Sequence, residues 1–264
     1  MSENAKLNIS RFLDYLIFPM IGLSVMLFFW WLGGYAIANN PDTSSFSDFA
    51  PIPTFKQFSH IISNGEVWGM AWPSLYRIGF GLFWAIIVGV PLGIMLGAFS
   101  RLHKAAYMPF QFLRMISPLA WMPIAVLVYA TWDSAIIFLI WIAALWPITF
   151  ATANGYSKMN PLWFKVAKNL GASPFQVLTH IIIRAISQDV LTGFRLSLGV
   201  AWIVIVPAEY LGVTNGLGYA INDARDTLEY DRLTAIILII GCIGFVLDAL
   251  CVFLIRKSNW IKRS

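Results

Sequence analysis

The sequence predicts an all-α polytopic membrane protein that crosses the bilayer six times, and three observations predict it. Of the 264 residues, 59% are hydrophobic. Only 12% are charged, whereas a soluble domain carries about 25% charged residues. The apolar residues gather into long stretches, and a helix needs about 20 of them to cross the hydrocarbon core of a bilayer. Lipid is therefore the expected solvent for most of this chain.

The predicted spans cover residues 15–38, 74–99, 115–131, 134–153, 190–213 and 233–255. The first span follows Lys6 and Arg11, as a signal peptide would. Its apolar run is longer than the roughly 7–15 residues of a signal core, so we expect a retained anchor. Only Trp132 and Asp133 separate the third and fourth spans. This spacing predicts a tight helical hairpin.

Lysines and arginines orient these spans, because cytoplasmic loops carry an excess of both. With the N-terminus inside, the inner segments hold Lys6, Arg11, Arg101, Lys104, Arg114, Lys158, Lys165, Lys168, Arg184, Arg256, Lys257, Lys262 and Arg263. The outer segments hold only Lys56, Arg77, Arg225 and Arg232. Both termini are therefore expected in the cytoplasm. The net charge of +5 reflects this topology and does not indicate nucleic-acid binding.

The inner segment 159–189 is long for a simple connection, and long loops are often functional. Pro161 falls in the first turn of a predicted helix. Gly171 suits the end of that helix, where a left-handed backbone is needed. Ser173 and Pro174 then predict the start of a second short helix, as its cap and first residue. Two interpretations are open: a helix pair resting on anionic lipid, or a docking element for a cytoplasmic partner.

This loop resembles the cytoplasmic loop of ABC importer permeases, in which Glu-Ala-Ala, Gly-Ala and Ile-x-Leu-Pro recur at fixed spacing. The matching residues are Ala167, Gly171, Ala172, Ile181 and Ile183. The resemblance implies a coupling helix that docks in a cleft of the ATP-hydrolysing subunit. Its docking residues would be Lys165, Ala167, Gly171, Ala172, Ser173 and Pro174. Lys165 replaces the family's Glu, and Arg184 replaces its Pro, so one charge is reversed at the docking surface.

Further segments resemble the type I ABC importer permeases for nitrate, bicarbonate, sulfonates and taurine. They are residues 74–81, 117–124, 191–195, 199–202, 208–209, 216–218 and 224–225. The resemblance implies the type I permease fold, with a transmembrane core of residues 72–257 that contains the coupling loop. Residues 1–71 would add the N-terminus, the first span and a periplasmic excursion, and residues 258–264 a cytoplasmic tail. The implied function is ATP-driven uptake of a small anion across a bacterial inner membrane.

The same resemblance implies the partners of this chain. They are ABC ATPase subunits carrying ATP and Mg²⁺, a periplasmic or lipid-anchored substrate-binding protein, a second permease copy in a homodimer, and membrane lipid. The chain has no Gly-x-x-x-x-Gly-Lys-Ser/Thr loop, so ATP hydrolysis is expected on a separate subunit. We expect no catalytic residues, metal site or cofactor on this chain. A permease for another solute such as a phosphonate, or an ATP-independent secondary transporter, remains an alternative.

Prolines and ionisable residues inside the spans mark a candidate translocation pathway. A proline frees a backbone carbonyl, which a membrane tolerates only against protein or a water-filled cavity. The candidates are Ser117, Pro118, Trp121, Pro123, Arg195, Trp202 and Glu209. Trp121 either lines this pathway or packs against other helices, and Arg195 either reaches back to water or contacts an anion. Glu209 is expected at a gate or in a helix-end hydrogen bond, and Asp248 is deep enough to need a partner.

Small residues recur at every fourth position of the second predicted span. They are Gly81, Ala85, Gly89, Gly93 and Gly97. In lipid, such a stripe lets two helix backbones approach closely. We therefore expect a packing face at Gly89, Gly93 and Gly97, within one chain or between two.

Overall fold

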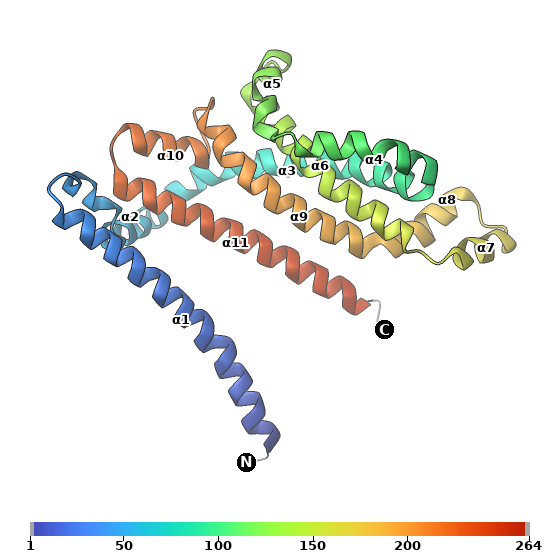
Figure 1. The fold of residues 1–264 in the computed structure, drawn as a ribbon, viewed down its shortest axis with the longest axis horizontal. Helices are drawn as coiled ribbons and strands as arrows, with labels where there is room; N and C mark the ends of the chain where they lie inside the picture. The colour runs from blue at the N-terminus through green and yellow to red at the C-terminus, as the bar shows by residue number, and fades with distance from the viewer. Residues whose placement is uncertain (1–2, 262–264) are drawn as a thin grey trace. The chain divides into compact units, whose positions relative to one another are not determined.

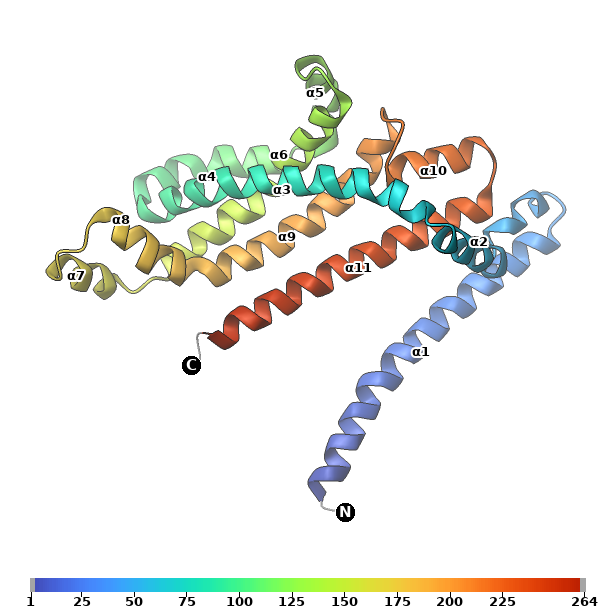
Figure 2. The same ribbon diagram turned by 180° about the vertical axis from the view of Figure 1, so that it is seen from behind.

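The computed structural model describes the backbone of residues 3–261 and the side chains of residues 17–257. All regular elements in this range are helices, which confirms the predicted all-α class (Figures 1 and 2). They are α1 (Glu3–Asn39), η1 (Ser44–Phe49), α2 (Pro51–Ser63), α3 (Glu66–Ala98), α4 (Ser100–Met115), η2 (Pro118–Trp121), α5 (Met122–Val128), α6 (Trp132–Ser157), α7 (Pro161–Asn169), α8 (Pro174–Gln176), η3 (Val177–Ile182), α9 (Ile183–Tyr210), α10 (Leu217–Asp226) and α11 (Tyr230–Ile261). The end of the expected cytoplasmic tail, residues 262–264, lies outside the described residues.

Five helices are long and apolar enough to cross a membrane, which confirms a polytopic chain. They are Ile17–Asn39, Glu66–Ala98, Trp132–Ser157, Pro174–Tyr210 and Tyr230–Lys257. A sixth span is reached only if Ser100–Met115 and Pro118–Val128 are counted together as one bent pair.

The predicted third span, residues 115–131, corresponds to part of a bent pair of helices and not to one continuous helix. The helix axis turns by 86° between α4 and the segment Pro118–Val128. Pro118 causes the break, because proline lacks a backbone N–H and disfavours a helical conformation in the residue before it. Ser117 is accordingly extended, with φ −57° and ψ 130°. α5 has only seven residues, so it packs against α6 as the short arm of the predicted hairpin and not as a full span.

The prediction of a separate short helix after Gly171 is wrong. Pro174 begins a single helical segment that continues to Tyr210 over 37 residues and includes the fifth predicted span. Between α8 and α9 lies one stretch of π-helix, η3, with wider turns than an α-helix. The sequence from 175 to 206 contains no proline, so nothing in it ends the helix.

The described chain divides into two compact units. The first comprises residues 1–66 and 223–239, and the second comprises residues 67–222 and 240–264. In the first unit, the rings of Phe46 and Phe49 pack against Tyr230, and the hydroxyls of Thr54 and Thr234 lie 2.7 Å apart.

The second unit is built around α6, which packs along α9 (Figure 2). Its buried core includes Ile136, Leu139, Ile140, Ala144, Ile148, Ala201 and Ile205. The small residues of α3 also allow a close approach to α6. A Cβ atom added to Gly93 would lie 2.6 Å from the carbonyl oxygen of Thr149, and one added to Gly97 would lie 2.6 Å from Cβ of Tyr156. A Cβ on Gly89 would lie 3.0 Å from Cγ2 of Ile148. The glycine stripe therefore faces α6 of the same chain.

Candidate functional site

A buried ion pair joins α3 to α9 in the second unit. The side chains of Arg77 and Glu209 are only 2% and 0% exposed, and Nη1 of Arg77 donates to Oε1 of Glu209 at 2.5 Å. Ser74 Oγ and the backbone N–H of Gly218 donate to the other carboxylate oxygen at 2.8 and 2.9 Å. The carboxylate of Glu209 is thus enclosed by donors of its own chain, as a buried charge requires. It has no free face for a solute in this conformation.

The remaining donors of Arg77 extend this network to α6 and to the loop after α9. Its Nε donates to Oδ1 of Asp133 at 2.7 Å, and Nη2 donates to Oδ1 of Asn215 at 2.5 Å. The carboxylate of Asp133 is 56% exposed, so this end of the network reaches the surface of the unit. The hydrogen bonds of Arg77 therefore link α3 to α6, to α9 and to the loop after α9.

Arg77 was counted among the charges of the outer segments, and the sequence alone did not reveal this network. The available signal was its position, since Arg77 falls inside the predicted span 74–99. An arginine within a span needs an acidic partner, and Glu209 falls inside another predicted span.

A second ion pair joins α9 to α11. Nε and Nη2 of Arg195 donate to Oδ1 and Oδ2 of Asp248 at 2.7 and 2.8 Å. This pair gives Asp248 the partner that the sequence alone could not assign. Unlike Arg77 and Glu209, the two side chains are 44% and 50% exposed on the single chain.

Trp202 lies two turns beyond Arg195 on α9 and packs against the same neighbour, α11. A Cβ atom added to Gly244 would lie 2.5 Å from Nε1 of Trp202, so the indole fills the space that this glycine leaves. The two candidate residues therefore belong to one seam between α9 and α11.

The broken segment after α4 borders a small cavity of about 180 Å³. Pro118 and Trp121 line it together with Arg114, Pro147 and other residues of α4, α6 and α9. Trp121 also packs against the core cluster around α6. Among the described residues that line the cavity, neither Arg195 nor Glu209 is found, and Ser117 and Pro123 are not lining residues either. The structure thus places the predicted pathway residues in three separate groups.

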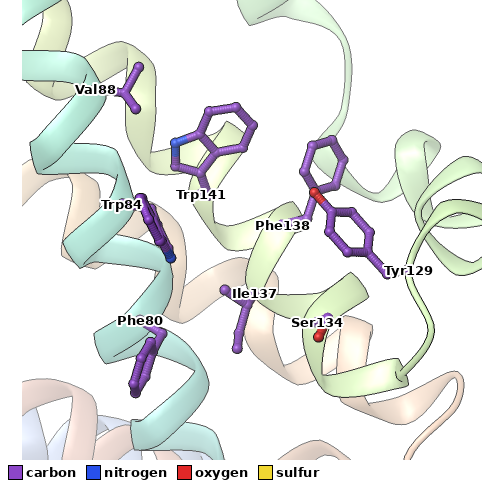
Figure 3. Close-up of a pocket in the computed structure, with 8 residues that line it drawn as sticks. All are labelled: Phe80, Trp84, Val88, Tyr129, Ser134, Ile137, Phe138 and Trp141. Atoms are coloured by element: carbon purple, nitrogen blue, oxygen red, sulfur yellow. The ribbon is translucent and has the colours of Figure 1, made fainter.

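A larger recess of about 450 Å³ lies between α3 and α6 (Figure 3). It is lined by Phe80, Trp84, Val88, Tyr129, Ser134, Ile137, Phe138 and Trp141. Figure 3 shows side chains of both helices facing one another across this space. The sequence alone gave no sign of this recess. Because its lining is mainly aromatic and aliphatic, it suits an apolar group and not a free anion.

The loop of residues 159–189 has the local backbone structure that its sequence predicts as far as Gln176. Asn160 Oδ1 accepts a hydrogen bond from the N–H of Leu162 at 2.9 Å, which caps α7. Gly171 then has a φ of +70°, a left-handed value that suits glycine. Ser173 forms a capping box with Gln176, with hydrogen bonds of 2.8 and 3.3 Å.

The loop also presents an apolar surface to its surroundings. Val166, Leu170 and Phe175 are 55%, 81% and 73% exposed, whereas Ala167 is buried. A groove of about 610 Å³ lies beside them, lined by Trp163, Val166, Ala167, Leu170, His180, Ile181, Arg184 and Ala185. Lys165 and Lys168 are exposed next to this surface. Exposed apolar residues with a charged rim are typical of a protein-binding surface.

Across the described residues, no cluster of three or more His, Cys, Asp or Glu side chains could hold a metal ion.

Comparison with known sequences gives consistent matches over most of the chain. The family model described as "Binding-protein-dependent transport system inner membrane component" matches residues 89–259. The bicarbonate transport system permease protein CmpB of Synechococcus elongatus is 31% identical over 258 residues, covering 96% of this chain and 91% of that protein. The nitrate import permease protein NrtB of Leptolyngbya laminosa is 32% identical, covering 74% of this chain and 69% of that protein. The taurine transport system permease protein TauC of Escherichia coli is 32% identical, covering 70% and 67%.

Among solved structures, an inward-facing form of the MetNI methionine ABC transporter contains a similar chain. The TM-score is 0.60 at 14% sequence identity, covering 71% of this chain and 93% of that chain. At this identity the match shows a shared fold.

Proposed function

This chain belongs to the family of binding-protein-dependent transport system inner membrane components, and from this we propose that it is the permease subunit of an ABC importer for a small anion. The proposed class of substrate is supported by the relatives of this chain. The bicarbonate, nitrate and taurine permeases each match more than two thirds of this chain. Their named solutes share a small group with several oxygen atoms and a negative charge. We infer that the solute of this chain has the same kind of group.

We propose that ATP and Mg²⁺ bind to a separate ATPase subunit, which docks on the inner loop. The docking residues would be Lys165, Ala167, Gly171, Ala172, Ser173 and Pro174. The exposed Leu170 and Phe175 support this role, because they offer apolar area beside the turn at Gly171. The basic residues Lys165 and Lys168 predict an acidic rim on the cleft of the ATPase.

The remaining partners would complete the importer. A second copy of this chain would form the other half of the pathway, and a periplasmic or lipid-anchored binding protein would deliver the solute to the outer side. Both termini would be cytoplasmic in a bacterial inner membrane. This orientation places the docking loop on the side where ATP is available.

We propose that the pathway is lined by the broken segment with Ser117, Pro118, Trp121 and Pro123, and by the seam with Arg195 and Trp202. Glu209 has a different role in this proposal. Since it is enclosed by Arg77, Ser74 and Gly218, it fastens the end of α9 and does not contact the solute. ATP binding would draw two docking loops together and shift the population of the dimer toward an outward-open state.

The test is purification of the tagged chain from its native membranes, followed by reconstitution in liposomes. We expect an ATPase subunit to co-purify. With the binding protein outside and ATP inside, the liposomes should accumulate labelled bicarbonate, nitrate or taurine. A preparation that transports without ATP would instead indicate a secondary transporter, and uptake limited to phosphonates would contradict the proposed solute class.

A further inference from the structure

The ion pair of Arg195 and Asp248 lies at a depth where apolar residues dominate both helices. Arg195 follows Arg184 by about 16 Å along α9, and Asp248 precedes Arg256 by about 12 Å along α11, at 1.5 Å per residue. The segments that contain them have mean hydropathies of 1.8 and 2.8 and qualify as membrane spans. These charges are therefore well inside the expected hydrocarbon layer.

About half of each side chain is nevertheless exposed on the single chain. Ionisable residues inside membrane spans face the interior of a bundle or a water-filled cavity, because contact with lipid is costly. The exposed side of this pair is therefore not a lipid-facing surface. It faces either protein or water once the transporter is assembled.

The geometry of the pair leaves part of Arg195 available. A guanidinium group has two edges that can each donate two parallel hydrogen bonds. Asp248 occupies the edge formed by Nε and Nη2. In the described part of the chain, Nη1 of Arg195 has no hydrogen-bond partner, so the edge formed by Nη1 and Nη2 is open.

There is also room beside Arg195 on the same face of α9. Gly199 lies one turn further along the helix, and a Cβ atom added there would meet nothing within 4 Å. One further turn along α9, Trp202 packs against Gly244 of α11, so its indole covers the surface there. The surface of α9 is therefore bare one turn beyond Arg195, at Gly199, and aromatic at the next turn, at Trp202.

We propose that the open edge of Arg195 binds the transported anion through two of its oxygen atoms, and that Asp248 is a positioning residue. Asp248 holds the guanidinium plane and offsets its charge. This offset keeps the affinity moderate, and a transport site must release its solute as well as bind it. The inference rests on the proposed function for the identity of the solute, but the site itself can be tested without transport.

The first experiment measures the site without transport. Gly199→Cys is made in a chain that also carries Cys242→Ala and Cys251→Ala, and its complex with the ATPase is purified. Two thiol reagents of similar size are compared, one with a sulfonate and one with a quaternary ammonium group. We expect the sulfonate reagent to react faster by about tenfold, because a fixed cation raises the local concentration of anions. Millimolar nitrate should slow this reaction.

Adding Arg195→Gln to this variant should abolish both the preference for the sulfonate reagent and the protection by nitrate. Two outcomes would overturn the proposal. Gly199→Cys would be unreactive with both reagents if this face is covered by lipid or protein. An unchanged preference in the Arg195→Gln background would show that Arg195 does not attract the anion.

The second experiment separates binding from a purely structural ion pair. Uptake is measured in liposomes for Arg195→Gln, Arg195→Lys, Asp248→Asn and the double variant Arg195→Gln/Asp248→Asn. Loss of charge-assisted hydrogen bonds to the solute should lower uptake by about tenfold or more in both Arg195 variants, since lysine keeps the charge without the fork. The double variant should stay as defective as Arg195→Gln.

If the ion pair only stabilises the fold, we expect the opposite result. The double variant then leaves no unpaired charge, and its uptake should recover. Uptake by the double variant at the wild-type rate would therefore overturn the inference. Absence of bicarbonate, nitrate and taurine uptake by the wild-type chain would contradict the proposed function instead, and the thiol experiment would still decide the role of Arg195.

Discussion

Arg77 and Glu209 lie 132 positions apart in the sequence and form a hydrogen-bonded ion pair of 2.5 Å with almost no exposure to solvent. Both residues fall within apolar helices, where each charge alone would be unfavourable. Their pairing joins the N-terminal part of α3 to the C-terminal end of α9, and Asn215 and Asp133 complete the set of acceptors around Arg77. The stability of this end of the second unit therefore depends on one arginine.

The first prediction concerns that arginine. Arg77→Met should leave Glu209 buried without a cation, at a cost of about 3–5 kcal/mol. Lys158→Gln is the control, because the ion pair of Lys158 with Asp189 has a lysine that is 61% exposed. Its loss should cost less than about 1 kcal/mol. Thermal unfolding in detergent measures both, and equal stabilities of the two variants would contradict the assigned role of Arg77.

The second prediction concerns the close contact of α3 with α6. Gly93→Ala would place a methyl group 2.6 Å from the carbonyl oxygen of Thr149, so the helices must separate and folded protein should be reduced. Gly79→Ala on the same helix meets nothing within 4 Å. Alanine should stabilise the helix there by up to about 1 kcal/mol. The yield of monodisperse protein in size-exclusion chromatography distinguishes the two variants, and equal yields would argue against tight packing at Gly93.

The third prediction concerns the turn of the docking loop. Gly171→Val forces a β-branched residue into a left-handed backbone, which costs about 1–2 kcal/mol or more. Gly171→Asn is the control, since asparagine tolerates that conformation. We expect the valine variant to insert normally but to lose uptake and co-purification of the ATPase. Normal uptake by Gly171→Val would remove this turn from the coupling mechanism.

The fourth prediction concerns the bend before α5. Spin labels at Lys104→Cys and Leu127→Cys should be about 24 Å apart across the 86° bend, but about 35 Å apart on a straight helix. Pro118→Ala restores a backbone N–H and should shift the population toward the longer distance. Pro109→Ala, within α4, should leave it unchanged. Pulsed electron paramagnetic resonance measures both distances, and a long distance in the unsubstituted background would contradict the bend.

Local signals in the sequence predicted local structure well. Pro161 does begin a helix, Gly171 does have a left-handed backbone, and Ser173 does cap the next helix. Each prediction depends on residues within one or two turns, where steric rules act directly. The long apolar stretches also identified the membrane helices, because burial in lipid depends on composition.

The direction of a helix axis and the pairing of residues far apart in the sequence were harder to predict. The stretch 115–131 has the composition of a span, but composition does not contain the 86° turn before Pro118. Similarly, Arg77 was counted with the outer segments, although it falls inside the predicted span 74–99. Its true environment depends on Glu209, which lies far away in the sequence and is brought close only by the packing of α3 and α9.

The uninterrupted helix from Pro174 to Tyr210 has a mechanical consequence. Between Pro174 and Pro207 it is about 50 Å long at 1.5 Å per residue. Near its middle, a Cβ atom added to Gly193 would lie 2.7 Å from Cβ of Ala151 and 3.0 Å from the carbonyl oxygen of Pro147, and the contact with α6 continues through Ala201 and Ile205. Two helices that are packed along their length move as one body. We therefore expect a push on the turn at Gly171 to displace α9 and α6 together.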